Sequence, residues 1–228
     1  DAGRRQAMPH ALLFDIDGTL LYDAHGIGRA AFGTAFLAAY GAPYPDVAGL
    51  SFIGATDSNV VRMMAAACGV ASTPAREEHF FLRLAQEIDA GLAQNRPHVY
   101  PGVPELLESL HRRGEALGII TGNVRATAWC KLRHAGLDRA FTFGAYGDEH
   151  HNRTEIARLA LRRSPARARA LVGDTPFDVR AAHANGLKAV AVATGWVSAA
   201  ELAEAGADLI LDDFSDTARV ISLIDALV

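Results

Sequence analysis

The stretch Ala11-Leu-Leu-Phe-Asp-Ile-Asp-Gly-Thr-Leu20 decides how this chain of 228 residues folds. It runs without a polar residue as far as Asp15, and such continuous apolar runs are typical of strands buried on both faces, as in parallel sheets. Side chains alternate along a strand, so we expect Asp15 and Asp17 to point to one side while Ile16 packs on the other. Gly18 then permits a sharp exit of the chain.

Further apolar runs lie downstream, at residues 116–120, 141–144, 168–172, 189–193 and 208–211. Helical patterns separate them. Residues 103–113 place apolar side chains on one face, and Ser198-Ala-Ala-Glu201 is a capping box that marks a helix start. Strands and helices that alternate from residue 100 onward predict an α/β fold with a doubly wound parallel sheet.

The region from about residue 24 to residue 98 breaks this rhythm, because it contains no convincing strand. It shows helical stretches near 28–40, 57–69 and 75–94, and the simplest account is a helical subdomain inserted between the first and second strands. We therefore predict a core domain of residues 8–22 and 99–228 and a helical subdomain of residues 23–98.

Polar residues at the strand ends carry the candidate chemistry, because ligands of open α/β sheets bind at the carboxyl ends of the strands. The first run ends on Asp15 and Asp17, the second on Thr121-Gly-Asn123, and the fourth on Gly173-Asp-Thr-Pro-Phe-Asp178. Carboxylates gathered in one place repel one another unless they surround a hard cation, and Mg²⁺ is the common choice beside phosphates. Such an ion would also keep Asp15 ionised, as a nucleophile requires.

These motifs, in this order and spacing, resemble those of the haloacid dehalogenase superfamily of hydrolases, most closely its phosphoglycolate phosphatase-like members. The resemblance covers essentially the whole chain. It implies a Rossmann-like core with a helical cap, and a Mg²⁺-dependent phosphatase that acts on a small phosphorylated metabolite. A cap that closes over the site would exclude a polymer substrate, so we expect no phosphoprotein or nucleic acid to bind there.

The resemblance also implies a role for each matching position. Asp15 would attack phosphorus and form an aspartyl-phosphate, and Asp17 would serve as the acid and then the base. Thr121, Gly122 and Asn123 would hold phosphoryl oxygens. The metal ligands would be Asp15, Asp174 and the backbone carbonyl of Asp17, with Asp178 supporting the site from behind.

One position departs from the family pattern. Similar proteins usually carry a Lys near the start of the helix after the third strand, but neither Lys131 nor Lys188 occupies that place. Arg153 stands there instead, and its guanidinium can hold a carboxylate and a phosphate bidentately. We therefore expect Arg153 to bind the nucleophile and the phosphoryl group.

Simpler interpretations stand beside each motif. Asp15 and Asp17 could be turn residues, Thr121-Gly-Asn123 could be only a strand end, and Thr175-Pro-Phe-Asp178 could be only a helix cap. The segment 26–31 matches a dinucleotide-binding pattern but lies too far from a strand end, and the adjacent histidines 150 and 151 suggest a zinc site only weakly.

Three rival functions share part of the pattern. A 2-haloacid dehalogenase would lack the second aspartate of the first motif, so Asp17 disfavours it. A phosphosugar mutase would share every core motif. A receiver-like protein could bind Mg²⁺ and phosphate as a signal without turnover.

Composition limits the partners. A formal net charge of −4 offers no electrostatic footprint for nucleic acid or an anionic membrane. The polar segment 1–10 has no apolar signal region, and no uncharged run reaches the roughly 18 residues of a membrane span, so we expect a cytoplasmic protein. As to its assembly, we expect a monomer or a homodimer. Cys68 and Cys130 are interpreted as unpaired packing residues of helices.

Overall fold

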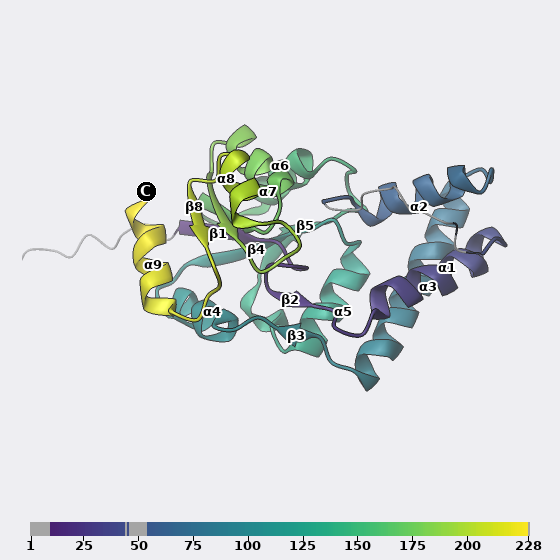
Figure 1. Cartoon of the computed structure of the whole chain (residues 1–228), viewed down its shortest axis with the longest axis horizontal. Coiled ribbons are helices and arrows are strands. Elements are labelled where there is room, and N and C mark those ends of the chain that lie inside the picture. The colour runs from purple at the N-terminus through teal and green to yellow at the C-terminus, as the bar shows by residue number, and fades with distance from the viewer. Residues whose placement is uncertain (1–9, 44, 46–53, 228) are drawn as a thin grey trace, which may run out of the picture.

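The computed structural model describes residues 10–43, 45 and 54–227. The molecule is elongated, with the sheet and its covering helices at one end and helices α1, α2 and α3 at the other (Figure 1). The first two residues of the predicted core domain, including Met8, lie outside the described residues.

The sheet contains six parallel strands in the order β5-β4-β1-β6-β7-β8. Their bounds are β1 His10–Phe14, β4 Ala116–Ile120, β5 Phe143–Ala145, β6 Arg167–Gly173, β7 Lys188–Val192 and β8 Leu209–Leu211. Counted along the chain among themselves, these strands have the spatial order 3-2-1-4-5-6 of the doubly wound nucleotide-binding folds, which reverses between β1 and β6. The predicted Rossmann-like α/β fold is therefore confirmed.

Most predicted strands lie within one residue of the observed bounds, but two differ by two residues at one end. The first stops at Phe14, because the backbone oxygen of Ile16 accepts the N–H groups of Thr19, Leu20 and Leu21 and turns the chain out of the sheet. The third begins at Phe143 and not at residue 141, because Phe141 and Thr142 lead out of a short 3-10 helix, Asp138–Ala140. One inter-strand hydrogen bond still lies beyond each limit, since the N–H of Asp15 donates to Val172 at 2.9 Å and the N–H of Thr142 donates to Leu117 at 3.1 Å.

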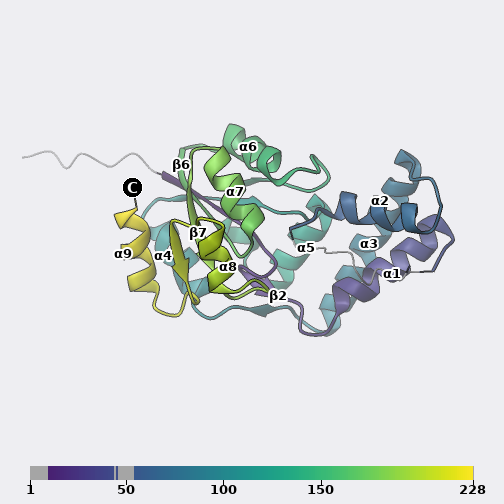
Figure 2. The same cartoon turned by 45° about the horizontal axis from the view of Figure 1, so that its top comes forward.

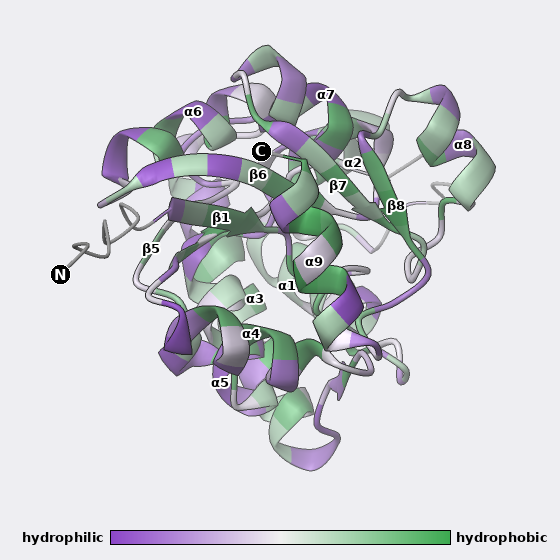
Figure 3. Ribbon diagram, turned by 90° about the vertical axis from the view of Figure 1, so that its left-hand side faces the viewer, coloured by the Kyte–Doolittle hydropathy of each residue, from purple (hydrophilic) through white to green (hydrophobic). Residues whose placement is uncertain are grey.

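Helices cover both faces of the sheet. One face carries α4 (Val103–Arg112), α5 (Arg125–Ala135) and α9 (Thr217–Ala226), and the other carries α6 (Arg153–Arg163), α7 (Pro176–Ala184) and α8 (Ala199–Glu204). Leu12 and Phe14 of β1 pack into the first layer and Leu13 into the second, as alternation along a buried strand requires. Figure 3 shows the apolar residues of β1, β7 and β8 between these helical layers.

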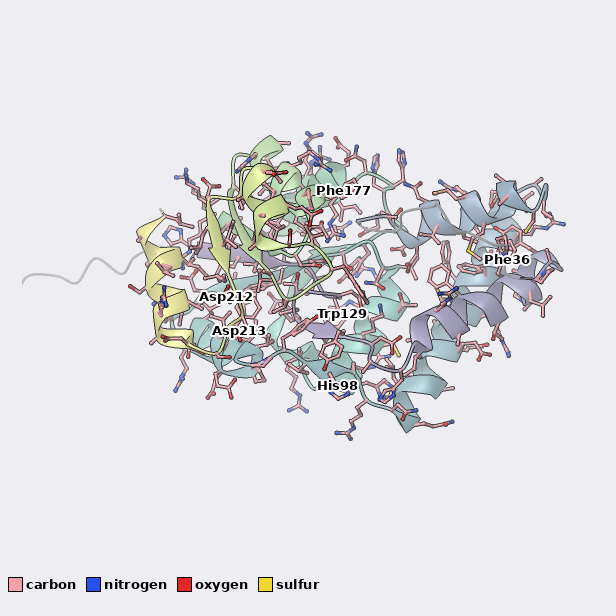
Figure 4. All side chains as sticks on the ribbon, in the orientation of Figure 1. Phe36, His98, Trp129, Phe177, Asp212 and Asp213 are labelled. Carbon is pink, nitrogen blue, oxygen red and sulfur yellow. The ribbon has the colours of Figure 1, made fainter. Side chains whose placement is uncertain are left out.

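The helical insertion contains α1 (Ile27–Tyr40), α2 (Asp57–Ala67) and α3 (Pro74–Gln94). It has an apolar core of its own, in which Phe36 and Phe80 are fully buried, and Figure 4 shows Phe36 among these helices and far from the sheet. Thr73 caps α3 with its side chain, and Pro74 follows as the first helical residue. None of the helices in the described ranges is long and apolar enough to cross a membrane.

A two-stranded antiparallel ribbon joins the insertion to the core. In it β2 (Leu21–Tyr22) pairs with β3 (His98–Val99), with Leu21 opposite Val99 and Tyr22 opposite His98. No convincing strand was expected between about residue 24 and residue 98, because two residues are too few to form a periodic pattern. The chain therefore leaves and re-enters the core at adjacent points (Figure 2).

Candidate active site

Three neighbouring strands, β4, β1 and β6, end at the same edge of the sheet and deliver the predicted site residues there. They contribute to a cavity of about 250 Å³ whose lining includes Asp15, Asp17, Thr121, Gly122, Asn123, Arg153 and Asp174. The position matches the point where the strand order reverses, which is the expected ligand site of such folds. A larger hollow of about 830 Å³ lies elsewhere, at His10, Arg167 and Lys188, and contains none of the predicted site residues.

Asp15 is buried and faces a buried arginine. Arg153 is the first residue of α6, where Asn152 caps the helix, and its Nη2 lies 2.5 Å from an oxygen of Asp15 and 2.7 Å from Asp178. Its Nε also donates to Asp178 at 2.8 Å. Burial lowers the pKa of Arg153, but the two carboxylates outweigh it and raise the pKa overall. Arg153 is therefore a fixed cation that bridges the candidate nucleophile to the residue behind it.

Asp15, Asp174 and Asp178 form a compact acidic cluster. One oxygen from each lies within 4.8 Å of the others. Burial, together with the neighbouring carboxylates, raises the pKa of Asp15 to about 7 and that of Asp174 to about 8, against a partial opposing effect of Arg153. One guanidinium does not neutralise three carboxylates, so the cluster fits a divalent cation with oxygen ligands.

Two glycines leave the space that Asp174 occupies. A Cβ added to Gly18 would lie 2.2 Å from the Asp174 carboxylate, and one added to Gly195 would lie 1.9 Å from it. Gly18 also has a φ of 79°, which favours glycine. Thr19 donates to the same carboxylate at 3.1 Å, so the turn after β1 orients Asp174 as well as Asp15.

Asp178 combines the two roles that the sequence left open. Its carboxylate accepts from Arg153, and it also accepts from the hydroxyl of Thr175 at 2.6 Å and from the Thr175 N–H at 3.1 Å. Thr175 and Asp178 form a capping box at the start of α7, with Pro176 as the first helical residue. The motif is therefore a helix cap that also fixes the arginine of the site.

Asp17 has a partner that the sequence analysis missed. Lys131, from the middle of α5, donates to both carboxylate oxygens of Asp17 at 2.9 and 2.8 Å, and also to the Asn123 side chain at 2.8 Å. Asn123 in turn donates to Asp17 at 2.6 Å and to the Thr121 hydroxyl at 2.7 Å. Burial lowers the pKa of Lys131, but Asp17 and Asp57 outweigh it and raise the pKa overall.

The position of Lys131 could have been suspected from the sequence. It is one of only two lysines in the chain, and it lies four residues after Thr127, hence on the same face of α5. Thr127 is fully buried, so this face looks inward. As predicted, Lys131 does not stand at the start of the helix after the third strand, but it reaches the site from another helix.

The insertion contacts the core at the edge of the cavity. The N–H of Asp57 donates to the carbonyl of Gly122 at 2.8 Å, and the Asp57 carboxylate accepts from the N–H of Val124 at 2.9 Å. Burial raises the pKa of Asp57 to about 6, with Lys131 opposing the shift. Thr56, and not Asp57, is the cap of α2. A Cβ on Gly122 would lie 2.4 Å from the carbonyl oxygen of Ala55, so this contact requires a glycine.

The backbone of the second motif is partly occupied. The N–H of Asn123 donates to the Thr121 hydroxyl at 3.2 Å, and the next N–H along the chain goes to Asp57. These donors would have to exchange partners to reach a phosphoryl oxygen. The alternative zinc ligands His150 and His151 stack on each other, and neither belongs to a group of three possible metal ligands among the described residues.

The chain is similar to known proteins both in sequence and in fold. The family model described as haloacid dehalogenase-like hydrolase matches residues 12–192. A phosphoglycolate phosphatase of Rhodospirillum rubrum is 32% identical over 91% of this chain and 89% of its own length. A 5′-nucleotidase of Pseudomonas aeruginosa is 32% identical over 84% and 86% of the two chains. Among solved structures, a putative β-phosphoglucomutase from Thermotoga maritima is 24% identical, with a TM-score of 0.62. The match covers 94% of this chain and 99% of that one, and this likeness shows only that the two chains share a fold.

The fold and the site define a hydrolase with a doubly wound core and a helical cap. The chain belongs to the haloacid dehalogenase-like hydrolases, which confirms the resemblance drawn from the motifs. With phosphatases among its relatives, it is an enzyme of the phosphoric monoester hydrolase type.

Proposed function

We propose that the protein is a Mg²⁺-dependent phosphatase that hydrolyses a small phosphomonoester through an aspartyl-phosphate, with phosphoglycolate as the first substrate to test. The observation that carries the proposal is the shared cavity in which Asp15 faces Arg153 and lies beside Asp174. A nucleophilic carboxylate, a fixed cation and a candidate metal site are the elements that phosphoryl transfer needs, because catalysis of this step is mainly positioning and charge stabilisation.

Asp15 would attack phosphorus with the carboxylate oxygen that Arg153 leaves free. Arg153 holds the other oxygen at 2.5 Å, so it fixes the direction of attack. The phosphorus–oxygen bond to the leaving group would then break, and the phosphoryl group would remain on Asp15 until water releases it. Arg153 and Thr121 are the side chains we assign to the phosphoryl oxygens, with the N–H groups of Gly122 and Asn123 beside them.

Asp17 would transfer the protons. It would donate one to the leaving oxygen and later remove one from the attacking water. Its side chain is 43% exposed and is held by Lys131 and Asn123, so it would have to leave Lys131 in order to carry a proton. We infer that Lys131 holds Asp17 in place until the substrate enters.

Asp15, Asp174 and the backbone of Asp17 are the groups we assign to Mg²⁺, with Asp178 behind them. The ion, when bound, would supply positive charge to the ionised carboxylates and to the phosphoryl group. The raised pKa values of Asp15 and Asp174 support this assignment, because burial and the neighbouring carboxylates raise them and Arg153 offsets only part of that effect.

The substrate would be small. A volume of about 250 Å³ is below the usual range of small-molecule sites, which begins at about 300 Å³. The insertion closes part of the cavity with Phe32, Asp57 and Ile88. Phosphoglycolate fits this size and is the named substrate of a relative in Rhodospirillum rubrum, whereas a nucleotide, suggested by the relative in Pseudomonas aeruginosa, would need a more open site.

The test is a panel of phosphorylated metabolites assayed for phosphate release with Mg²⁺, run on the wild type and on Asp15→Asn. We expect multiple turnovers on phosphoglycolate that EDTA or Asp15→Asn abolishes. The matched control is Asp212→Asn. Asp212 is an exposed aspartate that follows β8 (Figure 4), and strands β6 and β7 lie between β8 and the strand β1 that precedes Asp15. Activity of Asp15→Asn equal to the wild type would refute the assignment of the nucleophile.

The same assay separates the rival functions. Phosphate release without a sugar bisphosphate primer favours a phosphatase over a phosphosugar mutase. Repeated turnover excludes a receiver-like protein, which would bind phosphate and Mg²⁺ as a signal.

A further inference from the structure

A second group of potential metal ligands lies outside the cavity. Asp89 of α3, and Cys130 and His134 of α5, each offer a ligand atom, and the three atoms lie within 4.8 Å of one another. The Cys130 thiol donates to an oxygen of Asp89 at 3.3 Å, and Nε2 of His134 lies 2.9 Å from the same oxygen. None of these residues takes part in the proposed phosphatase chemistry.

The ligand types suit zinc. A thiolate, an imidazole and a carboxylate are the three side chains that bind Zn²⁺ in proteins, and three of them with one open position for water make a complete tetrahedral site. Zinc bond lengths of about 2.0–2.3 Å and tetrahedral angles require ligand atoms about 3.3–3.7 Å apart. The observed 2.9 and 3.3 Å therefore have to widen by only a few tenths of an ångström.

The arrangement on the helices also favours a cation. Cys130 and His134 are four residues apart, so they share one face of α5, and both lie in its last two turns. The carboxyl end of a helix carries partial negative charge. Asp89 is 63% exposed in its side chain, which gives an ion access from solvent, whereas Cys130 is almost fully buried.

We propose that Asp89, Cys130 and His134 form a zinc site that ties the helical insertion to the sheet domain. As Zn²⁺ binds, the S–H bond of Cys130 breaks, its proton passes to solvent, and the sulfur pair forms the bond to zinc. No oxidant or reductant takes part.

The site lies between the two parts of the molecule that meet over the cavity. Helix α3 belongs to the insertion and α5 to the layer on the sheet, and the two pack side by side (Figures 1 and 2). The residue after Cys130 is Lys131, which holds Asp17. Bound zinc would restrain α3 against α5 and so slow any opening of the insertion during turnover, a consequence that rests on the proposed phosphatase activity.

The experiment uses the full chain, stripped of metal and then saturated with Mg²⁺, and titrates Zn²⁺ and Co²⁺. We expect one Zn²⁺ to bind in competition with a chromophoric chelator, and Co²⁺ to give a thiolate charge-transfer band. Cys130→Ser should abolish the band, and Asp89→Asn or His134→Ala should weaken Zn²⁺ binding by more than about tenfold. The matched control is Cys68→Ser, which removes the other free cysteine and should bind as the wild type does.

Absence of the Co²⁺ band in the wild type, or its persistence in Cys130→Ser, would overturn the proposal whatever the catalytic activity. His134→Ala keeps the thiol and guards against a folding defect of Cys130→Ser. Zinc should also lower the rate of phosphate release in the wild type and in Cys68→Ser but not in Cys130→Ser. Equal inhibition of all three would assign the effect to the Mg²⁺ site and refute the restraint.

Discussion

Replacement of Arg153 by Met tests the central electrostatic argument. The guanidinium is buried between Asp15 and Asp178, and its removal leaves two buried carboxylates without their cation. Breaking a buried ion pair in this way costs about 3–5 kcal/mol. The free energy of unfolding of a typical domain is about 5–15 kcal/mol, so this cost is a large part of it. We expect Arg153→Met to lose about 3–5 kcal/mol of unfolding free energy in urea at pH 7 without metal.

Catalysis should fall as well, for a separate reason. Arg153 lowers the pKa of Asp15, which burial otherwise raises, so without Arg153 that pKa rises further above about 7. Loss of the cation also removes charge stabilisation from the phosphoryl group, so kcat/KM at saturating Mg²⁺ should drop by about 10²–10³. At limiting Mg²⁺ the rate should recover partly at higher pH, where Asp15 is ionised. Arg153→Lys keeps the charge and restores the residue that is usual in the family, so it should retain most of the stability and keep the wild-type pH profile.

The control for both measurements is Arg158→Met, on an exposed part of the same helix, where Glu155 is the ion-pair partner of the arginine among the described residues. It should change stability by less than about 1 kcal/mol. An Arg153→Met variant as stable and as active as Arg158→Met would show that Arg153 neither compensates the buried carboxylates nor assists the nucleophile.

The other predictions concern Lys131, Gly195 and the metal. Lys131→Met should lower kcat/KM by about 10²-fold, through loss of the positioning of Asp17. Lys188→Met, at a half-buried lysine of β7 that pairs with Asp208, should not; equal rates in steady-state assays would contradict this. Gly195→Ala should weaken Mg²⁺ binding at least about tenfold in isothermal titration, because the added Cβ meets the Asp174 carboxylate. In metal-free protein the pKa values of Asp15 and Asp174 are raised to about 7 and 8. The folded state therefore keeps protons on these carboxyls that the unfolded chain loses above about pH 4. Folding is then less favourable at high pH, so Tm should fall as the pH rises from about 5 to 8. Mg²⁺ binds the ionised pair and should raise Tm most at pH 8; a Tm in EDTA that rises over this range in scanning calorimetry would contradict the argument.

Much of this architecture could be predicted from the sequence, because buried parallel strands have an unmistakable pattern. The runs that precede Asp15 and Thr121 are continuous and apolar, and the run before Asp174 is interrupted only by Arg169. Each run places its polar residue at the carboxyl edge of the sheet. The helix bounds followed from caps such as Thr175 and Ser198, which act locally and are therefore visible in a few residues.

What could not be predicted depends on contacts between distant elements. Lys131 reaches Asp17 across a separation of 114 residues, and its spacing from Thr127 suggests which face of the helix it shares but not the residue that it contacts. Asp57 directly follows the cap of α2, and only the packing of α2 on the loop at Gly122 brings its carboxylate to the site. The β2–β3 ribbon is too short for any periodic signal.

That ribbon has a consequence for how such a protein can diversify. Tyr22 and His98 lie opposite each other in an antiparallel pair, so the backbone positions that bracket the insertion are only about 5 Å apart. A different helical module, grafted between these two positions, would therefore need no change in the strand that bears the nucleophile. Substrate choice and bond-breaking chemistry can thus evolve, or be engineered, as separate parts of one chain.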